Sequence, residues 1–303
     1  MKSAIAGRRI TVVEVGPRDG LQNERASISA ADKIEFINRL SGANLPVIEV
    51  TSFVSPTWVP QMADAEQVCA GIARRPGIRY TALVPNLAGL DRAARAGIAE
   101  IAVFAAATES FSRKNINQSI DESLANYRQV CDRATAMGIR VRGYVSTAFG
   151  CPYEGAVEPR QAADVAARLI EAGVFEVAIS DTIGIAHPGL VSRVLDAVLE
   201  RTPVAQVALH FHDTRGTALA NVLTAMPFGV STFDASAGGL GGCPYAPGAA
   251  GNLATDDLLY MLEGMGVETG VSLHALSEAS AFIGERLDHP LPSRYFQAMK
   301  NRS

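Results

Sequence analysis

Eight short apolar runs rich in β-branched residues recur along the chain, and helix-like stretches separate them. The runs span residues 10–15, 47–52, 80–84, 100–106, 140–146, 176–181, 207–212 and 231–237. Stretches with apolar residues at spacings of three to four span residues 31–45, 90–98, 123–139, 159–174 and 189–202. This alternation predicts an α/β fold of the (β/α)8 type, a TIM barrel.

An open, doubly wound sheet is the structural alternative. Such a sheet ordinarily carries a GxGxxG phosphate turn after an early strand, whereas this chain has GPRDG at residues 16–20. The pattern therefore favours the barrel. Helix-like segments at residues 252–266 and 272–287 follow the eighth run. We expect a single catalytic domain over residues 1–303, with a C-terminal helical extension from about residue 267.

The composition of the chain excludes several function classes. With 48% hydrophobic residues it can build a packed core, and its net charge of -4 provides no basic face for nucleic acid. No apolar run approaches the roughly 20 residues that cross a bilayer. The start of the chain lacks an export signal, and no two of its cysteines form a CxxC pair. We therefore expect a cytoplasmic protein without nucleic-acid or membrane partners.

The most specific local signal is the His-x-His pattern of LHFHD, at the end of the seventh run. A strand places alternate side chains on one face, so His210 and His212 face the same way and Phe211 faces the other. Two neutral imidazoles at the active-site end of a barrel strand suit a metal ion. A hydrogen-bonded pair of core histidines is the alternative, and the strand context favours the metal.

Two further residues are candidate metal ligands. Asp19 follows the first run and would supply a carboxylate from the neighbouring rim, although PRDG is also an ordinary turn signal. Asn252 precedes a helical segment and serves by default as a helix N-cap, while its amide oxygen is a candidate neutral ligand.

Charged residues at other strand ends form a second group. Glu49 interrupts an apolar strand, where a buried carboxylate needs a cationic partner, and Arg18 is the candidate. The pair is either catalytic or a structural ion pair. Asp181 has a comparable choice between an active-site role and helix capping.

Two loops carry the remaining candidates. The Gly/Pro-rich segment 238–252 is long for a βα connection and predicts a lid with Cys243 at its centre as a proton donor or acceptor. The segment after the fourth run carries Arg113, Lys114 and Asn115, which would suit a phosphate-bearing substrate tail or a solvated turn. Cys69 and Cys131 lie in helical segments and are expected to be inert, and Cys151 is undecided.

These residues lie in motifs that together resemble those of the 3-hydroxy-3-methylglutaryl-CoA lyase family. The motifs are distributed over nearly the whole chain, and several are long and unusual in composition. They are VEVGPRDGLQNE (13–24), IEVTSFVSPTWVPQM (48–62), KNIN (114–117), VRGYVS (141–146), GCPYEG (150–155), SDTIG (180–184), HFHDTRGTALAN (210–221) and GLGGCPYAPGAAGNLATDDLLYMLEG (239–264).

The resemblance implies a TIM-barrel carbon–carbon lyase that needs a divalent metal, Mg²⁺ or Mn²⁺, and forms acetyl-CoA and acetoacetate as in leucine degradation. By motif, the metal ligands would be Asp19, His210, His212 and Asn252. Arg18 would contact the thioester carbonyl, Cys243 would be the loop acid or base, and Glu49 and Asp181 would support them. We also expect an acyl-CoA substrate and a homodimer.

Other activities are compatible with the same residues. The nearest is a lyase for a longer branched substrate such as 3-hydroxy-3-isohexenylglutaryl-CoA, since one change in the pocket can admit a tail. A condensing enzyme of the isopropylmalate or citramalate synthase kind usually needs a longer chain than 303 residues. A mononuclear iron oxygenase uses a similar two-histidine, one-carboxylate set, and a non-catalytic binding protein is the most distant alternative.

Overall fold

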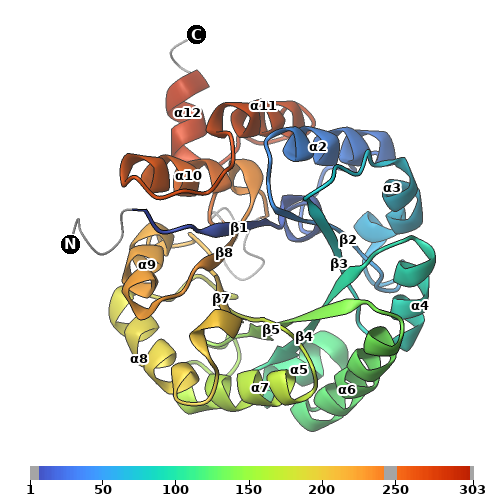
Figure 1. Cartoon of the computed structure of the whole chain (residues 1–303), viewed down its shortest axis with the longest axis vertical. Helices are drawn as coiled ribbons and strands as arrows, with labels where there is room; N and C mark the ends of the chain where they lie inside the picture. The colour runs from blue at the N-terminus through green and yellow to red at the C-terminus, as the bar shows by residue number, and fades with distance from the viewer. Residues whose placement is uncertain (1–6, 242–250, 301–303) are drawn as a thin grey trace.

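A closed barrel of parallel strands forms the centre of the protein, and helices ring it (Figure 1). The computed structural model describes residues 7–241 and 251–300. The strands pair in chain order, and β8 closes the barrel against β1. They are β1 (Thr11–Glu14), β2 (Val47–Ser52), β3 (Arg79–Leu83), β4 (Glu100–Ala106), β5 (Arg140–Ser146), β6 (Val177–Ser180), β7 (Val207–His210) and β8 (Thr232–Ala235). The predicted TIM barrel is therefore confirmed.

α-Helices form the outer layer, and short helical turns lie in the connections between the elements. The helices are α2 (Ala30–Gly42), α3 (Ala65–Gly71), α4 (Leu87–Arg95), α5 (Glu109–Ile116), α6 (Ile120–Ala136), α7 (Pro159–Glu171), α8 (Pro188–Leu199), α9 (Ala218–Ala225), α10 (Thr255–Gly264), α11 (Leu273–Gly284) and α12 (Arg294–Lys300). The short turns are η1 (Gly16–Gly20), η2 (Pro60–Met62), η3 (Val204–Gln206), η4 (Met226–Phe228) and η5 (Ala237–Gly239).

Local sequence signals mark several helix boundaries. The Ser119 hydroxyl accepts a hydrogen bond from the Glu122 backbone amide, and the Glu122 carboxylate accepts one from the Ser119 backbone amide, a capping box that starts α6. Asn117, in the left-handed conformation, ends the preceding helix α5. Residues 109–116 were expected to be part of a loop, so α5 corrects that expectation. Its apolar positions Phe111 and Ile116 are too few to give a periodic signal in the sequence.

The largest hydrophobic core lies between the barrel and the helices, with residues such as Ile37, Val103 and Leu195 fully buried. The barrel interior is more polar, because Arg142, Asp234 and Glu49 are buried in strands whose other residues are mostly apolar. Charged side chains are rarely buried unless they are paired. The interior of this barrel is therefore built partly from ion pairs.

The C-terminal helical extension is present. Helix α11 packs against α2, next to which it lies in Figure 1, and α12 packs against α10. The backbone of Ser272 donates to the Ala43 carbonyl at 2.9 Å and joins the start of α11 to the end of α2. Among the described residues, no helix is long and apolar enough to cross a membrane.

Candidate metal centre and active site

A cavity of about 530 Å³ opens at the carboxyl ends of the strands. Active sites of TIM barrels lie at this end, because the βα loops and the last residues of the strands meet there. Side chains from several strand ends and loops line it, among them Arg18, Asp19, Asn115, Tyr144, His210 and His212.

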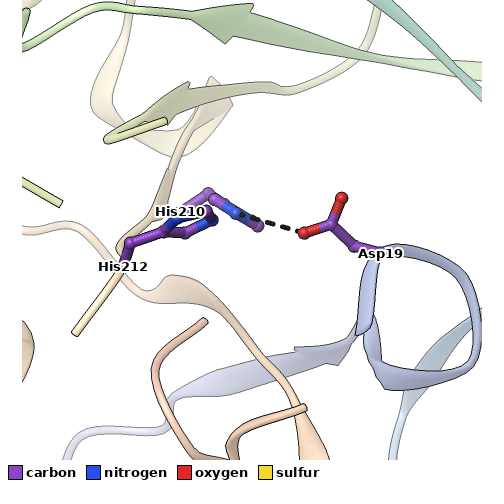
Figure 2. Close-up of side chains that lie close together, drawn as sticks. All are labelled: Asp19, His210 and His212. Carbon is purple, nitrogen blue, oxygen red and sulfur yellow. Dashed lines mark ion pairs between the residues drawn. The ribbon is translucent and has the colours of Figure 1, made fainter. Parts of the chain in front are cut away.

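Asp19, His210 and His212 come together in this cavity. One ligand atom from each of them lies within 4.8 Å of the others. In Figure 2 the carboxylate of Asp19 points from η1 toward the two imidazoles. Its Oδ2 atom lies 3.8 Å from His210 Nε2, and the centroids of the two imidazole rings lie 5.2 Å apart. The two-histidine, one-carboxylate cluster expected from the sequence is therefore present as a candidate metal centre.

The two histidines share a face, although the strand ends between them. Strand β7 stops at His210, and His212 instead forms an isolated bridge with Asn252. Phe211 points away into the hydrophobic core, where the centroid of its ring lies 5.8 Å from the centroid of the Phe149 ring. The alternation of side chains thus continues past the regular strand.

Glycines at both ends of η1 let Asp19 approach the histidines closely. A Cβ atom on Gly16 would lie 2.6 Å from Glu14 Oε1, and one on Gly20 would lie 2.7 Å from Leu240 Cβ. Both positions are too tight for any larger residue. GPRDG is consequently more than a turn signal, since its glycines allow η1 to pack against the segment after β8.

The residues at the cluster fit a divalent cation. Among the residues that the structure describes, His212 Nδ1 and Asn252 Oδ1 are buried and have no hydrogen-bond partner, so two potential metal-ligand atoms are left unsatisfied. Asn252 Nδ2 donates to Asp19 Oδ2 at 3.0 Å, which places this amide beside the cluster. One carboxylate, two imidazoles and an amide oxygen form a plausible donor set for such ions.

The protonation states of His212 and Asp19 suit metal binding. Burial lowers the pKa of His212 to about 3, with the neighbouring His210 contributing, so the imidazole is neutral at physiological pH. Burial opposes ionisation of Asp19, but the Arg18 guanidinium, together with the two histidines and the Asn252 hydrogen bond, outweighs it and holds the pKa of that carboxyl well below its usual range. A metal ion needs both forms, a neutral imidazole and an ionised carboxylate.

Arg18 and Glu49 form the ion pair expected from the sequence. Arg18 donates from Nε to Glu49 Oε2 at 2.7 Å and from Nη1 to Asp19 Oδ1. Tyr144 donates its hydroxyl to the same Glu49 oxygen at 3.3 Å. Burial raises the pKa of Glu49, and the Arg18 charge acts in the opposite direction. Glu49 thus holds Arg18 at the wall of the cavity, next to the metal cluster.

The other candidates lie farther from the cluster or outside the described part of the chain. Asp181 is buried and accepts from the backbone amides of Ile185 and Ala186 at 3.0 and 3.1 Å in the loop before α8, but it does not cap that helix, whose N-cap residue is His187. Asn115 lines the cavity. Arg113 is mostly exposed beside Glu109, and the Lys114 ammonium lies 4.0 Å from the centre of the Tyr153 ring. Cys243 lies outside the described residues.

Three buried residues near the cluster were not among the candidates predicted from the sequence. Tyr144 lines the cavity, Asp234 contacts His210, and Arg142 contacts both Tyr144 and Asp234. Arg142 and Asp234 are, like Glu49, charged residues inside apolar strands, so the sequence contains a signal for both of them.

An α/β barrel that gathers two histidines and a carboxylate in a cavity at the carboxyl ends of its strands has the architecture of a metal-dependent barrel enzyme. The particular family follows from comparison with known proteins. The chain belongs to the HMGL-like family, whose model matches residues 9–283.

Relatives of known name agree with this assignment. The chain is 53% identical over 289 residues to the cytoplasmic 3-hydroxy-3-methylglutaryl-CoA lyase of Rattus norvegicus, covering 95% of this chain and 84% of the relative. It is similar to mitochondrial forms as well. The crystal structure of hydroxymethylglutaryl-CoA lyase from Pseudomonas aeruginosa has a TM-score of 0.96 and 48% identity, with 100% of both chains covered.

A third similar protein has been solved with ligands. It is an HMG-CoA lyase from Acinetobacter baumannii in complex with coenzyme A and 3-methylmalate, with a TM-score of 0.90 and 38% identity over 95% of this chain and 94% of that one. The family and the Asp19–His210–His212 cluster together support a divalent metal.

Proposed function

We propose that this chain cleaves 3-hydroxy-3-methylglutaryl-CoA to acetyl-CoA and acetoacetate in a reaction that depends on a divalent metal. The observation that carries the proposal is that Arg18 shares one cavity with the Asp19–His210–His212 cluster. The membership of the chain in the HMGL-like family, and the names of relatives that are about half identical to it, support the choice of substrate.

Asp19, His210, His212 and Asn252 would hold the metal. A divalent cation bound there would act as a Lewis acid toward oxygen atoms of the substrate and would orient them. The ion is Mg²⁺ or Mn²⁺ in this proposal, because the carboxylate and amide oxygens suit both ions and Mn²⁺ also tolerates imidazole ligands.

The side chains of the cavity would then carry the proton transfers. Asp19 or His210 removes the proton of the tertiary hydroxyl, whose oxygen becomes the ketone of acetoacetate as the carbon–carbon bond breaks. The electron pair of that bond moves into the thioester as an enolate. Arg18, whose charge faces the cavity, stabilises the developing negative charge on the thioester oxygen. Cys243 finally protonates the enolate carbon and completes acetyl-CoA.

Other residues would have supporting roles. Glu49 holds Arg18 by the ion pair described above, and Asp181 fixes the loop that follows β6 through its two backbone contacts. Asn115 would contact the acyl-CoA substrate inside the cavity, and Arg113 and Lys114 would contact its phosphate-bearing tail at the rim. We propose that the protein works as a cytoplasmic homodimer, with one catalytic domain over residues 1–303 and no nucleic-acid or membrane partner.

A competition assay tests the choice of substrate. Purified protein with Mn²⁺ receives equal amounts of 3-hydroxy-3-methylglutaryl-CoA and the isohexenyl homologue, and the two keto-acid products are separated by chromatography. The proposal requires acetoacetate to be the dominant product. Preferential cleavage of the isohexenyl substrate would instead show that this chain is a lyase for the longer branched substrate.

A further inference from the structure

A buried carboxylate stands directly behind one of the candidate metal ligands. Asp234, in β8, is 1% exposed, and its Oδ2 atom lies 3.2 Å from His210 Nδ1. The other ring nitrogen of His210, Nε2, faces Asp19. Asp234 is absent from the residues that line the cavity, so it has no direct access to a substrate.

We propose that Asp234 is a positioning residue that fixes the tautomer and the orientation of His210, so that Nε2 is the atom offered to the metal. This inference rests on the proposed metal centre, and it leaves Asp19 as the base for the hydroxyl proton, since both ring nitrogens of His210 are then engaged. A neutral imidazole carries one N–H, and an ionised carboxylate can only accept. With Asp234 ionised, Nδ1 must carry the hydrogen, and the lone pair of Nε2 is left facing Asp19. A carboxylate in this arrangement also makes the imidazole a more basic ligand.

Arg142 keeps the carboxylate of Asp234 in place. It donates from Nη2 to Asp234 Oδ1 at 2.8 Å and from Nη1 to Asp234 Oδ2 at 3.1 Å. This bidentate ion pair matches the guanidinium to the carboxylate in geometry and charge. Arg142 is itself 1% exposed. Its Nε donates to Glu176 Oε1 at 2.8 Å, and its Nη1 also donates to the Tyr144 hydroxyl at 3.0 Å. The carboxylate therefore has little freedom to turn away from His210.

The two candidate histidine ligands differ in the hydrogen bonding of their Nδ1 atoms. His212 Nδ1 is buried and has no hydrogen-bond partner among the described residues, whereas His210 Nδ1 is bound to Asp234. The structure thus orients His210 before a metal arrives, whereas Nδ1 of His212 has no partner among the described residues and is left as a candidate ligand atom. Removing Asp234 should accordingly weaken metal binding through His210 alone.

An Asp234→Asn variant tests the proposal. Three donors, two from Arg142 and one from His210, share the two carboxylate oxygens, and an amide replaces one of these oxygens with an NH₂ group. If that group faces His210, the imidazole must carry its hydrogen on Nε2 and cannot bind the metal through that atom. We expect Mn²⁺ to bind about 10–100-fold more weakly, the usual loss when such a partner is removed, with turnover at saturating Mn²⁺ measured separately.

Glu176→Gln is the matched control. It also replaces a carboxylate bound to Arg142, in this case a partly buried one, but it leaves the Asp234–His210 contact in place. We expect this variant to bind Mn²⁺ as the wild type does. Thermal melting of both variants reports any general loss of stability. Wild-type affinity in Asp234→Asn, or an equal loss of affinity in both variants, would overturn the proposal.

A second measurement needs no mutation and no metal. Nitrogen-15 spectra of metal-free wild-type protein, labelled in its histidines, report which ring nitrogen of His210 carries hydrogen. The proposal requires the Nδ1–H form, and an Nε2–H form would refute it even if Asp234→Asn failed to fold. Failure of the wild type to bind Mn²⁺ would refute the proposed metal centre instead, so the two failures can be distinguished.

Discussion

Arg18 contacts Glu49 and Asp19 at the same time, with its Nε atom 2.7 Å from Glu49 Oε2. One guanidinium thereby joins a buried carboxylate of β2 to the candidate metal ligand on η1. Lysine carries the same charge, but its donors share one nitrogen atom, so it cannot reproduce the planar contact that Arg18 makes through two nitrogens.

Arg18→Lys is therefore expected to lower kcat by about 10²–10³-fold, the usual effect of losing a donor aimed at a developing oxyanion. Steady-state kinetics at saturating substrate and Mn²⁺ check this prediction. Arg39→Lys serves as the control, because Arg39 pairs with Glu35 on the surface of α2 and should be replaceable without loss. A kcat for Arg18→Lys close to that of the control would remove Arg18 from the reaction.

The thiol of Cys243 is predicted to act in chemistry rather than in metal binding. Cys243→Ala should lower turnover by about 10²–10⁴-fold, the reach of a positioned acid or base, and leave Mn²⁺ affinity nearly unchanged. Cys131→Ala is the comparison, since burial raises the pKa of the Cys131 thiol to about 11 and makes it unreactive. Turnover above about a third of the wild-type rate in Cys243→Ala, far from the expected loss, would exclude the thiol from the mechanism.

The raised pKa of Glu14 predicts that the stability of the fold depends on pH. Burial raises the pKa of its carboxyl from 4.5 to about 8, so the folded state holds this proton more tightly than the unfolded state. The stabilisation is fully present below pH 4.5 and is lost as the pH rises toward about 8. The loss is on the order of a few kcal/mol.

Glu14→Gln should remove this dependence while it preserves the contacts. Glu14 Oε1 accepts from the backbone amides of Gly16 and Ala237, both at 2.8 Å, and Oε2 lies 2.7 Å from Thr255 Oγ1. A glutamine keeps all three bonds if the Thr255 hydroxyl becomes the acceptor. Urea unfolding of both metal-free proteins between pH 5 and 8.5 gives the comparison. A difference in unfolding free energy that stays constant over this range would show that Glu14 is already ionised at pH 5.

The fold could be predicted from the sequence because each barrel strand is a short apolar run and the helices between the runs have apolar residues at spacings of three to four. The runs at 47–52, 100–106 and 140–146 match β2, β4 and β5 residue for residue. Helix α5 could not be predicted, since its stability depends on capping and on contacts with α6 rather than on a regular apolar stripe.

The site residues that could be predicted are those whose signal lies within a single strand. His210 and His212 follow from the alternation along one strand, and Glu49 follows from a charge in an apolar run. The contact between Asp234 and His210 joins two strands and depends on their register, which pairs His210 with Asp234 across β7 and β8. Sequence periodicity within one strand contains no such information.

The central claim is that the Asp19–His210–His212 cluster binds the metal on which carbon–carbon cleavage depends. The most direct measurement uses metal-stripped wild-type and His212→Ala protein with 3-hydroxy-3-methylglutaryl-CoA, before and after addition of Mn²⁺, with acetyl-CoA and acetoacetate quantified together. We expect no products without metal, equal amounts of both products from the wild type once Mn²⁺ is added, and no recovery in His212→Ala. Full turnover without metal, or equal recovery in the two proteins, would contradict the account.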